Sequence, residues 1–535
     1  MTERILLENG RIVDGTGAPW RHGSVLIEGG TIAAVGADAD DNAADVAMDV
    51  DGSVVAPGFI DIHTHSDFTL PANREAHSKV RQGVTFEVVG NCGSSAAPRE
   101  GAAVEGIDSW FGRNGVADEV DTEAWTTMGE FLDHLEGGGV SLNVASLVGH
   151  GTVRAATMGH ADRQPTAEEL TRMREHVAAA MKDGAVGLST GLFYPPGAYA
   201  DIEEVVALAE VAAEHGGIYA THMRSESDDL IASVEETLEV GRRADVPVQI
   251  SHHKAIGPDN WGKVRYTLRR MDLAREHDGI DVQCDQYPYV ASSTSLGALL
   301  PTWAHDGGDE ALLDRLRDEE TYARLSEELK AGRSASWDGV LITRVSNPDL
   351  LEYEGRTLEE LATREDEERS PPEILLDIVL QDQNDTMHVN FGMDEDDVRT
   401  VMQHPLTMVG SDGSSLCTCG PLGEGTPHPR NYGAFPRVLG TYVREQATLD
   451  LETAVYKMTG LPASRLDLSD RGRLVAGSAA DVTVFDPDTV AQGGDFLDPH
   501  AYAEGIDHVL VNGEFVVRDG DHTGRRPGDV IGRDD

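Results

Sequence analysis

The chain has 535 residues, 26% charged and 40% hydrophobic, a balance that supports a large buried core and excludes a mostly disordered protein. On length alone, about two to four domains are expected. Its 94 Asp and Glu residues against 43 Lys and Arg give a formal net charge of -51, which repels nucleic acid and anionic lipid and argues against both as partners.

Lysine is scarce among the basic residues, and carboxylates greatly outnumber cations. Such a surface stays hydrated in concentrated salt, and salt shortens the range of self-repulsion to about 3 Å at 1 M. We therefore expect a halophilic protein from a salt-accumulating cell, with an ordinary acidic protein as the alternative.

The four cysteines, Cys92, Cys284, Cys417 and Cys419, do not form a dense framework, which fits a reducing cytosol. Residues 1–5 lack the apolar stretch of a signal peptide, and no run of about 18 apolar residues appears. We expect a cytoplasmic protein that does not enter a membrane.

Short strands separated by glycine-containing turns are predicted at both ends of the chain. The N-terminal ones cover residues 5–8, 11–13, 24–27 and 31–35. The C-terminal ones cover residues 481–485, 508–511 and 514–517, with a hairpin signal at Asn512-Gly513. Because neither segment builds a stable sheet alone, we expect residues 1–56 and 466–535 to form one small β-sandwich domain.

Between these segments, short apolar strands alternate with amphipathic helices. The predicted strands are 54–62, 85–90, 142–148, 187–190, 217–222, 248–252, 281–286, 387–391 and 406–411, and the helices include 167–181, 202–215 and 230–243. This alternation implies a parallel sheet, and a strand count near eight predicts an α/β fold, a (β/α)8 TIM-like barrel over residues 57–465. A doubly wound open sheet is the alternative, but no Gly-x-Gly-x-x-Gly turn opens a helix after an early strand.

Residues 303–384 break this alternation. The segment is charged and helical in pattern, most strongly over residues 309–330 and 357–368. We interpret it as a helical insertion late in the barrel that could act as a lid. A solvated structural elaboration is the alternative.

The predicted strand over residues 54–62 runs into His63-Thr64-His65. Alternate residues of a strand face the same side, so the two imidazoles project together. Side by side at the end of a strand, they can share one divalent ion.

Four further predicted strands end in, or just before, a potential metal ligand: Cys92, His222, His252 and Asp412. The C-terminal ends of barrel strands lie on one face, where the active sites of such folds are built. Taken singly, each could be a buried core histidine, an inert cysteine or a turn-forming aspartate. Their joint position favours a metal site, and thiolate with imidazole suits zinc better than magnesium.

Two other features are weaker. Cys417-Thr418-Cys419 could form half of a metal site, but no second pair nearby would complete tetrahedral coordination. His150 ends a predicted strand and is interpreted as a support for the site.

These motifs resemble the metal-dependent amidohydrolase superfamily, and within it the D-aminoacylase (N-acyl-D-amino-acid deacylase) group. The resemblance covers nearly the whole chain. Gly90-Asn91-Cys92-Gly93 and Thr221-His222-Met223-Arg224 are its more specific motifs. Further stretches that match the group are residues 9–17, 187–197, 285–289 and 428–433, and residues 472–474 with 477–482 resemble a tail widespread in the superfamily.

The resemblance implies that Cys92 replaces the carboxylated lysine that bridges two metals in many relatives. Cys92, His222 and His252 would hold a tight Zn2+, and His63, His65, Cys92 and Asp412 would form a second, weaker position. His253, next to His252, should face the other way and support the ligands from behind. Asp412 would take a proton from metal-activated water and pass it to the leaving nitrogen.

An N-acyl amino acid also carries a free carboxylate, which needs a cation. By resemblance, Lys254 and Tyr287 bind that carboxylate, and Tyr194 lies near the substrate. Arg224 and Arg430 are further candidates, with a structural ion pair as the alternative for each.

The expected function is therefore zinc-dependent hydrolysis of the amide bond of small N-acyl-D-amino acids, with the D preference implied by the resemblance alone. One alternative is a cyclic amide hydrolase of the hydantoinase or dihydropyrimidinase type. Those enzymes rely on a carboxylated lysine, and no lysine here ends a barrel strand suitably. Another is a catalytically inactive scaffold, which would be expected to lose ligands or the base.

Overall fold

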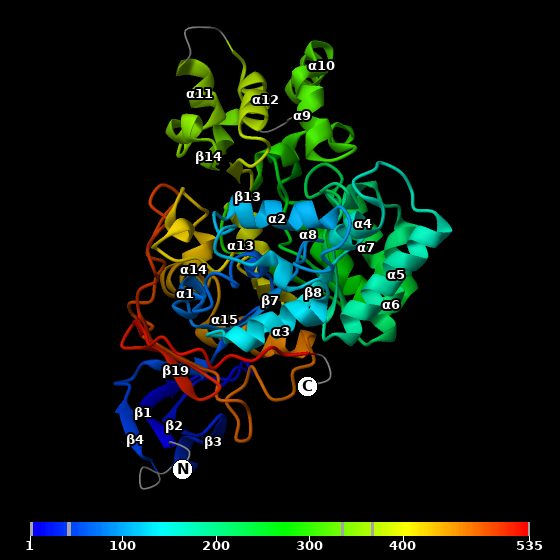
Figure 1. Cartoon of the computed structure of the whole chain (residues 1–535). Coiled ribbons are helices and arrows are strands. Elements are labelled where there is room, and N and C mark those ends of the chain that lie inside the picture. Colours follow the sequence, from blue (N-terminus) through cyan, green and yellow to red (C-terminus); the bar gives the residue numbers. More distant parts are fainter. Residues whose placement is uncertain (1–3, 40–43, 333–335, 365–368, 533–535) are drawn as a thin grey trace.

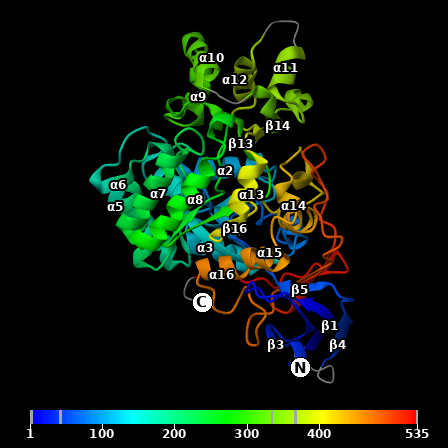
Figure 2. The same cartoon turned by 180° about the vertical axis from the view of Figure 1, so that it is seen from behind.

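The computed structural model describes residues 4–39, 44–332, 336–364 and 369–532. Three parts follow one another along the long direction of the molecule (Figure 1). A β sheet that includes the N-terminal strands lies at one end, a barrel lies in the middle and a mainly helical insertion lies at the other end. The view from behind shows the same arrangement (Figure 2).

The barrel has eight parallel strands in sequential order, with the last strand beside the seventh. They are β6 (Phe59–Asp61), β7 (Val84–Val89), β8 (Asn143–Gly149), β9 (Gly187–Gly191), β10 (Ile218–His222), β11 (Val248–Ile250), β12 (Val282–Gln286) and β16 (Thr407–Val409). A parallel bridge between Thr64 and Gly413 joins the chain just beyond β6 and β16. The predicted (β/α)8 barrel is confirmed.

Helices surround this barrel. They are α1 (His77–Val80), α2 (Ala103–Arg113), α3 (Met128–Gly138), α4 (His150–Met158), α5 (Ala167–Lys182), α6 (Ile202–Glu214), α7 (Leu230–Ala244), α8 (Lys263–Leu273), α13 (Glu395–Gln403), α14 (Arg430–Arg437), α15 (Leu451–Met458) and α16 (Gly460–Arg465). Helix α5 begins at a capping box, in which Thr166 and Glu169 satisfy each other's backbone N–H groups. None of the helices that the structure describes is both long and apolar enough to cross a membrane.

The two ends of the chain share one nine-stranded sheet. Its members are β1 (Arg4–Ile12), β2 (Arg21–Glu28), β3 (Thr31–Val35), β4 (Val46–Asp49), β5 (Val54–Pro57), β17 (Val482–Phe485), β18 (Ile506–Val511), β19 (Glu514–Arg518) and β20 (Asp521–His522). Strand β5 lies between β1 and β17 and so connects the two segments. The composite domain thus has its own apolar core, which includes Ile27, Val55 and Val484. The proposed domain boundaries stay a prediction.

Two strand predictions are corrected. The strand expected over residues 54–62 is divided at Gly58 into β5 of the composite sheet and β6 of the barrel. A Cβ atom at Gly58 would collide with the Thr85 side chain, so only glycine fits where the chain passes between the sheets. The barrel strand expected over residues 387–391 is instead β15 (Met387–Phe391) of a separate sheet. It pairs antiparallel there, and the sequence of a short strand does not by itself specify which strand it pairs with.

This separate sheet has the order β13-β15-β14 and belongs to the insertion between β12 and β16. The insertion comprises β13 (Ala291–Ser295), α9 (Asp309–Arg317), α10 (Glu319–Gly332), β14 (Val340–Arg344), α11 (Leu358–Arg364), α12 (Pro371–Gln381) and β15. Its helices pack on a core of their own, which includes Leu312, Leu325 and Leu375. Strands β13 and β14 were not predicted, and residues 365–368 lie outside the described part of the chain.

Candidate metal centre

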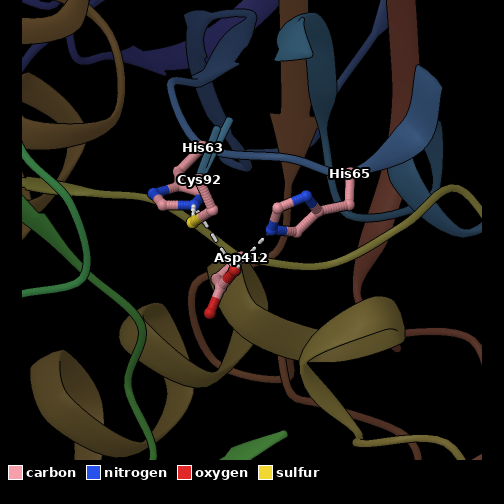
Figure 3. Close-up of side chains that lie close together, drawn as sticks. All are labelled: His63, His65, Cys92 and Asp412. Atoms are coloured by element: carbon pink, nitrogen blue, oxygen red, sulfur yellow. Dashed lines mark hydrogen bonds and ion pairs between the residues drawn. The ribbon is translucent and has the colours of Figure 1, made fainter. Parts of the chain in front are cut away.

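Side chains that follow β6, β7 and β16 point toward one another at one mouth of the barrel (Figure 3). Cys92 Sγ lies 3.3 Å from His63 Nε2. Asp412 Oδ1 lies 3.4 Å from His63 Nε2 and 3.0 Å from His65 Nε2. These four residues therefore form one cluster of sulfur, imidazole and carboxylate donors.

Cys92 also belongs to a second cluster with His222 of β10 and His252, which follows β11. The ligand atoms of these three residues lie within 4.8 Å of one another. Cys92 Sγ lies 3.4 Å from His252 Nε2. The sulfur thus stands between two possible metal positions, as the sequence analysis expected of a bridging ligand.

Three of these residues have left-handed backbone conformations, with φ of 53° at Cys92, 37° at His252 and 52° at Asp412. Such a conformation costs about 1–3 kcal/mol for a residue other than glycine and persists only where the surroundings impose it. The Asp412 N–H donates to the His63 carbonyl, and the His252 N–H donates to Asp285 Oδ1. Three of the six candidate metal ligands therefore have a strained backbone that hydrogen bonds to neighbouring segments help to hold.

Asp285 is a residue whose role the sequence analysis missed. It lies one residue before the end of β12, and this position at the C-terminal end of a barrel strand was a usable signal. Its Oδ1 lies 3.0 Å from His63 Nδ1, and its Oδ2 accepts from Gln249. By holding Nδ1, Asp285 leaves the Nε2 atom of His63 turned toward Cys92, an arrangement common behind metal-bound histidines.

Glu226 was also missed, although it lies only four residues beyond His222. This buried carboxylate places Oε1 2.8 Å from His252 Nδ1 and 2.6 Å from Lys254 Nζ, and Oε2 3.8 Å from His222 Nε2. Burial raises the pKa of Glu226, but Lys254 and His252 outweigh it and hold the pKa below its usual value. Glu226 is therefore an anion that fixes both an imidazole and the ammonium group expected to bind substrate.

The site stabilises ionised forms of two donors. Burial raises the pKa of the Cys92 thiol, but His63 and His252 outweigh it and hold the pKa well below the usual value. Burial likewise raises the pKa of the Asp412 carboxyl group, but Arg430 and His252 outweigh it and hold the pKa well below the usual value. A thiolate and a carboxylate are the forms that bind a cation.

A cavity of about 630 Å³ opens onto these donors. Tyr287 lines it with a buried hydroxyl group that has no hydrogen-bond partner among the described residues. Tyr194 also lines it, and its ring centroid lies 4.8 Å from that of His222. Lys254 lines the cavity too, with its ammonium group on Glu226. The structure thus brings the three residues expected near substrate to one space beside the donors.

The two arginine candidates have different surroundings. Arg224 donates to Glu236 and to the carbonyls of Ala198 and Ala200, so it forms the structural ion pair given as its alternative. Arg430 donates to Asp412 Oδ2 at 2.7 Å and to the Ser293 carbonyl, so it fixes the orientation of Asp412.

His253 and His150 lie outside both clusters. His253 faces away from the donors, as expected, and its Nε2 lies 2.8 Å from Thr267 Oγ1 of α8. Burial lowers the pKa of His253 to about 4. His150 Nε2 lies 2.7 Å from Glu204 Oε1, and Glu204 also pairs with Arg154. Both histidines thus stabilise the contacts around the barrel and belong to neither donor cluster.

The remaining cysteines offer no metal ligand. Cys417 and Cys419 are joined by a disulfide, a pairing that the sequence analysis did not predict, so they do not form half of a metal site. Cys284 is buried against Thr407 on the neighbouring strand.

The residues present fit a divalent metal. Both clusters combine a thiolate with imidazole groups, the donors that zinc prefers, and carboxylates hold the far nitrogen atoms of His63 and His252. Neither cluster contains a lysine or arginine side chain among its ligand atoms. The geometry therefore supports one site of three donors and an adjoining site of four that share Cys92.

Comparisons with known proteins agree with this chemistry. The model of the "Amidohydrolase family" matches residues 46–517. A D-aminoacylase of Alcaligenes xylosoxydans xylosoxydans is 41% identical over 530 residues, covering 99% of this chain and 97% of the relative. A solved D-aminoacylase described as having a binuclear metal center superimposes with a TM-score of 0.82 at 38% identity and 99% coverage of both chains. An N-acyl-D-glutamate deacylase of Bordetella bronchiseptica, solved with zinc and a phosphonate inhibitor, gives a TM-score of 0.80 at 37% identity, also covering 99% of both chains.

Proposed function

Because the chain belongs to the D-aminoacylase group of the amidohydrolase family, and so is a hydrolase of amide bonds, we propose that it cleaves N-acyl-D-amino acids into a D-amino acid and a carboxylic acid. The observation that carries the proposal is the position of Cys92 between two donor clusters, with Asp412 in one of them. The relatives named above, a D-aminoacylase and an N-acyl-D-glutamate deacylase, support the substrate class.

In this proposal the metal is Zn2+. Cys92, His222 and His252 would hold the tight ion, and His63, His65, Cys92 and Asp412 would hold a second, weaker one. The zinc in the solved deacylase and the sulfur and imidazole donors of this chain support that choice. When bound, zinc activates water for attack and polarises the carbonyl group of the substrate.

Asp412 is the proposed proton carrier. Its Oδ2 is held by Arg430 and its Oδ1 faces His65, so the carboxylate is fixed in orientation and ionised before substrate arrives. An ionised carboxylate can accept a proton from the attacking water and then donate it to the amide nitrogen, which leaves poorly unless protonated. One fixed group can therefore serve first as base and then as acid.

The substrate carboxylate is assigned to Tyr287 and Lys254. The Tyr287 hydroxyl group has no partner among the described residues and borders the cavity, so a ligand oxygen would satisfy it. Lys254 supplies positive charge beside it, with its Nζ 5.5 Å from the centroid of the Tyr287 ring. Tyr194 borders the same space and would contact the body of the substrate.

The two alternatives are less well supported. Cyclic amide hydrolases rely on a carboxylated lysine, whereas Cys92 occupies the shared position here and Lys254 is engaged by Glu226. An inactive scaffold would be expected to lose donors, whereas all six metal-binding candidates converge.

The test is hydrolysis of N-acetyl-D-methionine, N-acetyl-L-methionine and hydantoin by the purified protein in high salt, with its zinc content measured beforehand. We expect zinc in the protein, turnover of the D substrate alone, and loss of turnover on chelation with recovery on adding zinc. Preference for the L substrate or for hydantoin would contradict the proposed activity, and a folded protein that binds no zinc would favour the scaffold.

A further inference from the structure

Five lysine and arginine side chains line the cavity: Arg113, Arg224, Lys254, Arg344 and Arg430. Four of them have acceptors. Arg113 donates to Asp385 and to a backbone carbonyl, and the partners of Arg224, Lys254 and Arg430 are described above. Arg344 alone forms no hydrogen bond or ion pair with any residue that the structure describes.

Arg344 comes from the insertion and not from the barrel. It ends β14 and stands opposite Met387 of β15, which also borders the cavity. Its side chain reaches the loop after α2, where its Nη2 atom lies 2.5 Å from the position that a Cβ atom on Gly115 would take. Glycine at that position, with φ of 72°, leaves room for the guanidinium group.

The Arg344 guanidinium group is half-buried, and no hydrogen bond or ion pair with a described residue compensates for the hydration that it loses. Burial lowers the pKa of Arg344, and the nearby Glu424 and Glu354 act in the opposite direction. Neither carboxylate is close enough to pair with it, and the Glu354 side chain accepts from the Val345 N–H instead. A cation withdrawn from water without a partner is unfavourable, so this group is suited to an anion that enters the cavity.

We propose that Arg344 binds a second carboxylate of the substrate, so that the preferred substrates are N-acyl-D-amino acids that carry two anionic groups. This inference rests on the proposed function. The planar guanidinium group matches a carboxylate through two parallel hydrogen bonds. Tyr287 and Lys254 lie beside the metal ligands, whereas Arg344 lies on the insertion, so the two carboxylates would bind to separate parts of the cavity.

Two parts of a substrate could supply this second carboxylate: an acidic side chain or a dicarboxylic acyl group. One arm of the test compares N-acetyl-D-glutamate with N-acetyl-D-glutamine, which has nearly the same shape and no side-chain charge. The other arm compares N-succinyl-D-leucine with N-butanoyl-D-leucine, which lacks the terminal carboxylate. The arm that shows a preference identifies the source.

In the zinc-loaded wild-type protein, we expect the charged member of one pair to have a kcat/KM about 10-fold or more above its neutral partner. Arg344→Gln should lower that ratio by about 10-fold, mainly through KM, and Arg344→Lys should restore part of it. A ratio that Arg344→Gln leaves unchanged in both pairs, or a wild-type preference for both neutral substrates, would overturn the inference. Thermal melting of each variant verifies that it folds.

Failure of the proposed function is distinguishable from failure of this inference. Hydrolysis of the neutral substrates without an effect of Arg344 would reject the inference and keep the function. If the zinc-loaded protein cleaves none of the four substrates, the function fails, and calorimetry with glutarate and butanoate still tests Arg344. About 10-fold weaker glutarate binding by Arg344→Gln than by the wild type would support the anion site, and equal binding would reject it.

Discussion

Asp412 has a different neighbour at each of its carboxylate oxygens. Its Oδ1 faces His65 and His63, whereas its Oδ2 accepts from Arg430. The cluster of Cys92, His222 and His252, which is proposed to hold the tight zinc ion, does not include it. The proposed roles in proton transfer and in tight metal binding can therefore be tested separately at this residue.

Asp412→Asn should accordingly retain about one zinc ion per chain and lose turnover by about 10²–10⁴-fold, because an amide cannot carry the proton. Metal analysis and kcat for N-acetyl-D-methionine measure the two effects. Asp498→Asn, at an exposed turn, is the matched control. Turnover retained by the Asp412 variant would remove this residue from the mechanism.

Glu226→Gln should weaken zinc binding by about 10–100-fold, because Glu226 holds the Nδ1 atom of His252 behind the proposed ligand. It should also raise KM, because Lys254 loses the carboxylate that holds its ammonium group in position for the substrate. Competition with a chromogenic chelator measures the first effect independently of turnover. Glu214→Gln on the exposed end of α6 is the control, and unchanged zinc affinity and KM in the Glu226 variant would refute this role.

At the scale of elements, the sequence predicts the type and position of helices and strands better than it predicts which strands pair with each other. Helices α5, α6 and α7 begin at the expected residues and end within one residue of the expected ends, because their apolar periodicity and caps are local signals. The strand ends that carry the metal-binding candidates were located for the same reason. By contrast, the place of β15 in a separate sheet depends on contacts with β13 and β14 that its own residues do not specify.

The candidate site shows the same difference between residues with a local sequence signal and residues whose role depends on contacts in the fold. The residues that follow strands were predicted, since each ends an apolar run. Glu226 and Arg344 were missed because their importance comes from what surrounds them in space, whereas Asp285 was missed although it lies at the C-terminal end of a strand. Glu226 matters through Lys254 and His252, and Arg344 matters through the absence of any acceptor among the described residues.

Strand β20 contacts the loop before α1 through a histidine whose pKa is strongly shifted. His522 Nε2 lies 2.9 Å from the Glu75 carbonyl, and its ring centroid lies 4.9 Å from that of His77. Burial lowers the pKa of His522 to about 4, with further lowering by His77 and Arg81. An unfolded histidine has a pKa near 6.5. Between about pH 6.5 and pH 4 the unfolded chain therefore binds more protons, and this contact loses stability as the pH falls.

His522→Gln should thus show a smaller fall in melting temperature than the wild type between about pH 7 and pH 5. Melting curves at fixed ionic strength measure the difference. His277→Gln, at an exposed position, is the control and should follow the wild type. An identical pH dependence in the His522 variant would exclude the contact as a pH-sensitive element.

At the scale of the whole molecule, the composite sheet, the barrel and the insertion each bury an apolar cluster, while the net charge of -51 acts on all three. Mutual repulsion of carboxylates opposes the compact state, and salt shortens its range. The stability of the fold should therefore depend on ionic strength more than on any single surface ion pair.

The melting temperature should rise as KCl increases from about 0.1 M to about 3 M, with activity following it, because screening relieves this repulsion. Calorimetry across the series measures the change. Sucrose at matched osmolality separates screening from general exclusion of solutes. Full stability and activity in dilute buffer would refute the halophilic expectation.

The position of β5 between β1 and β17 has a consequence for biosynthesis. The ribosome makes β5 early, but its neighbour β17 emerges only after the barrel and the insertion have been translated, a delay of tens of seconds at about 5–20 residues per second. During that interval the nascent chain exposes an unpaired apolar strand edge, the kind of surface on which neighbouring polypeptides aggregate. We therefore expect chaperones that shield such edges to raise the yield of this protein during expression.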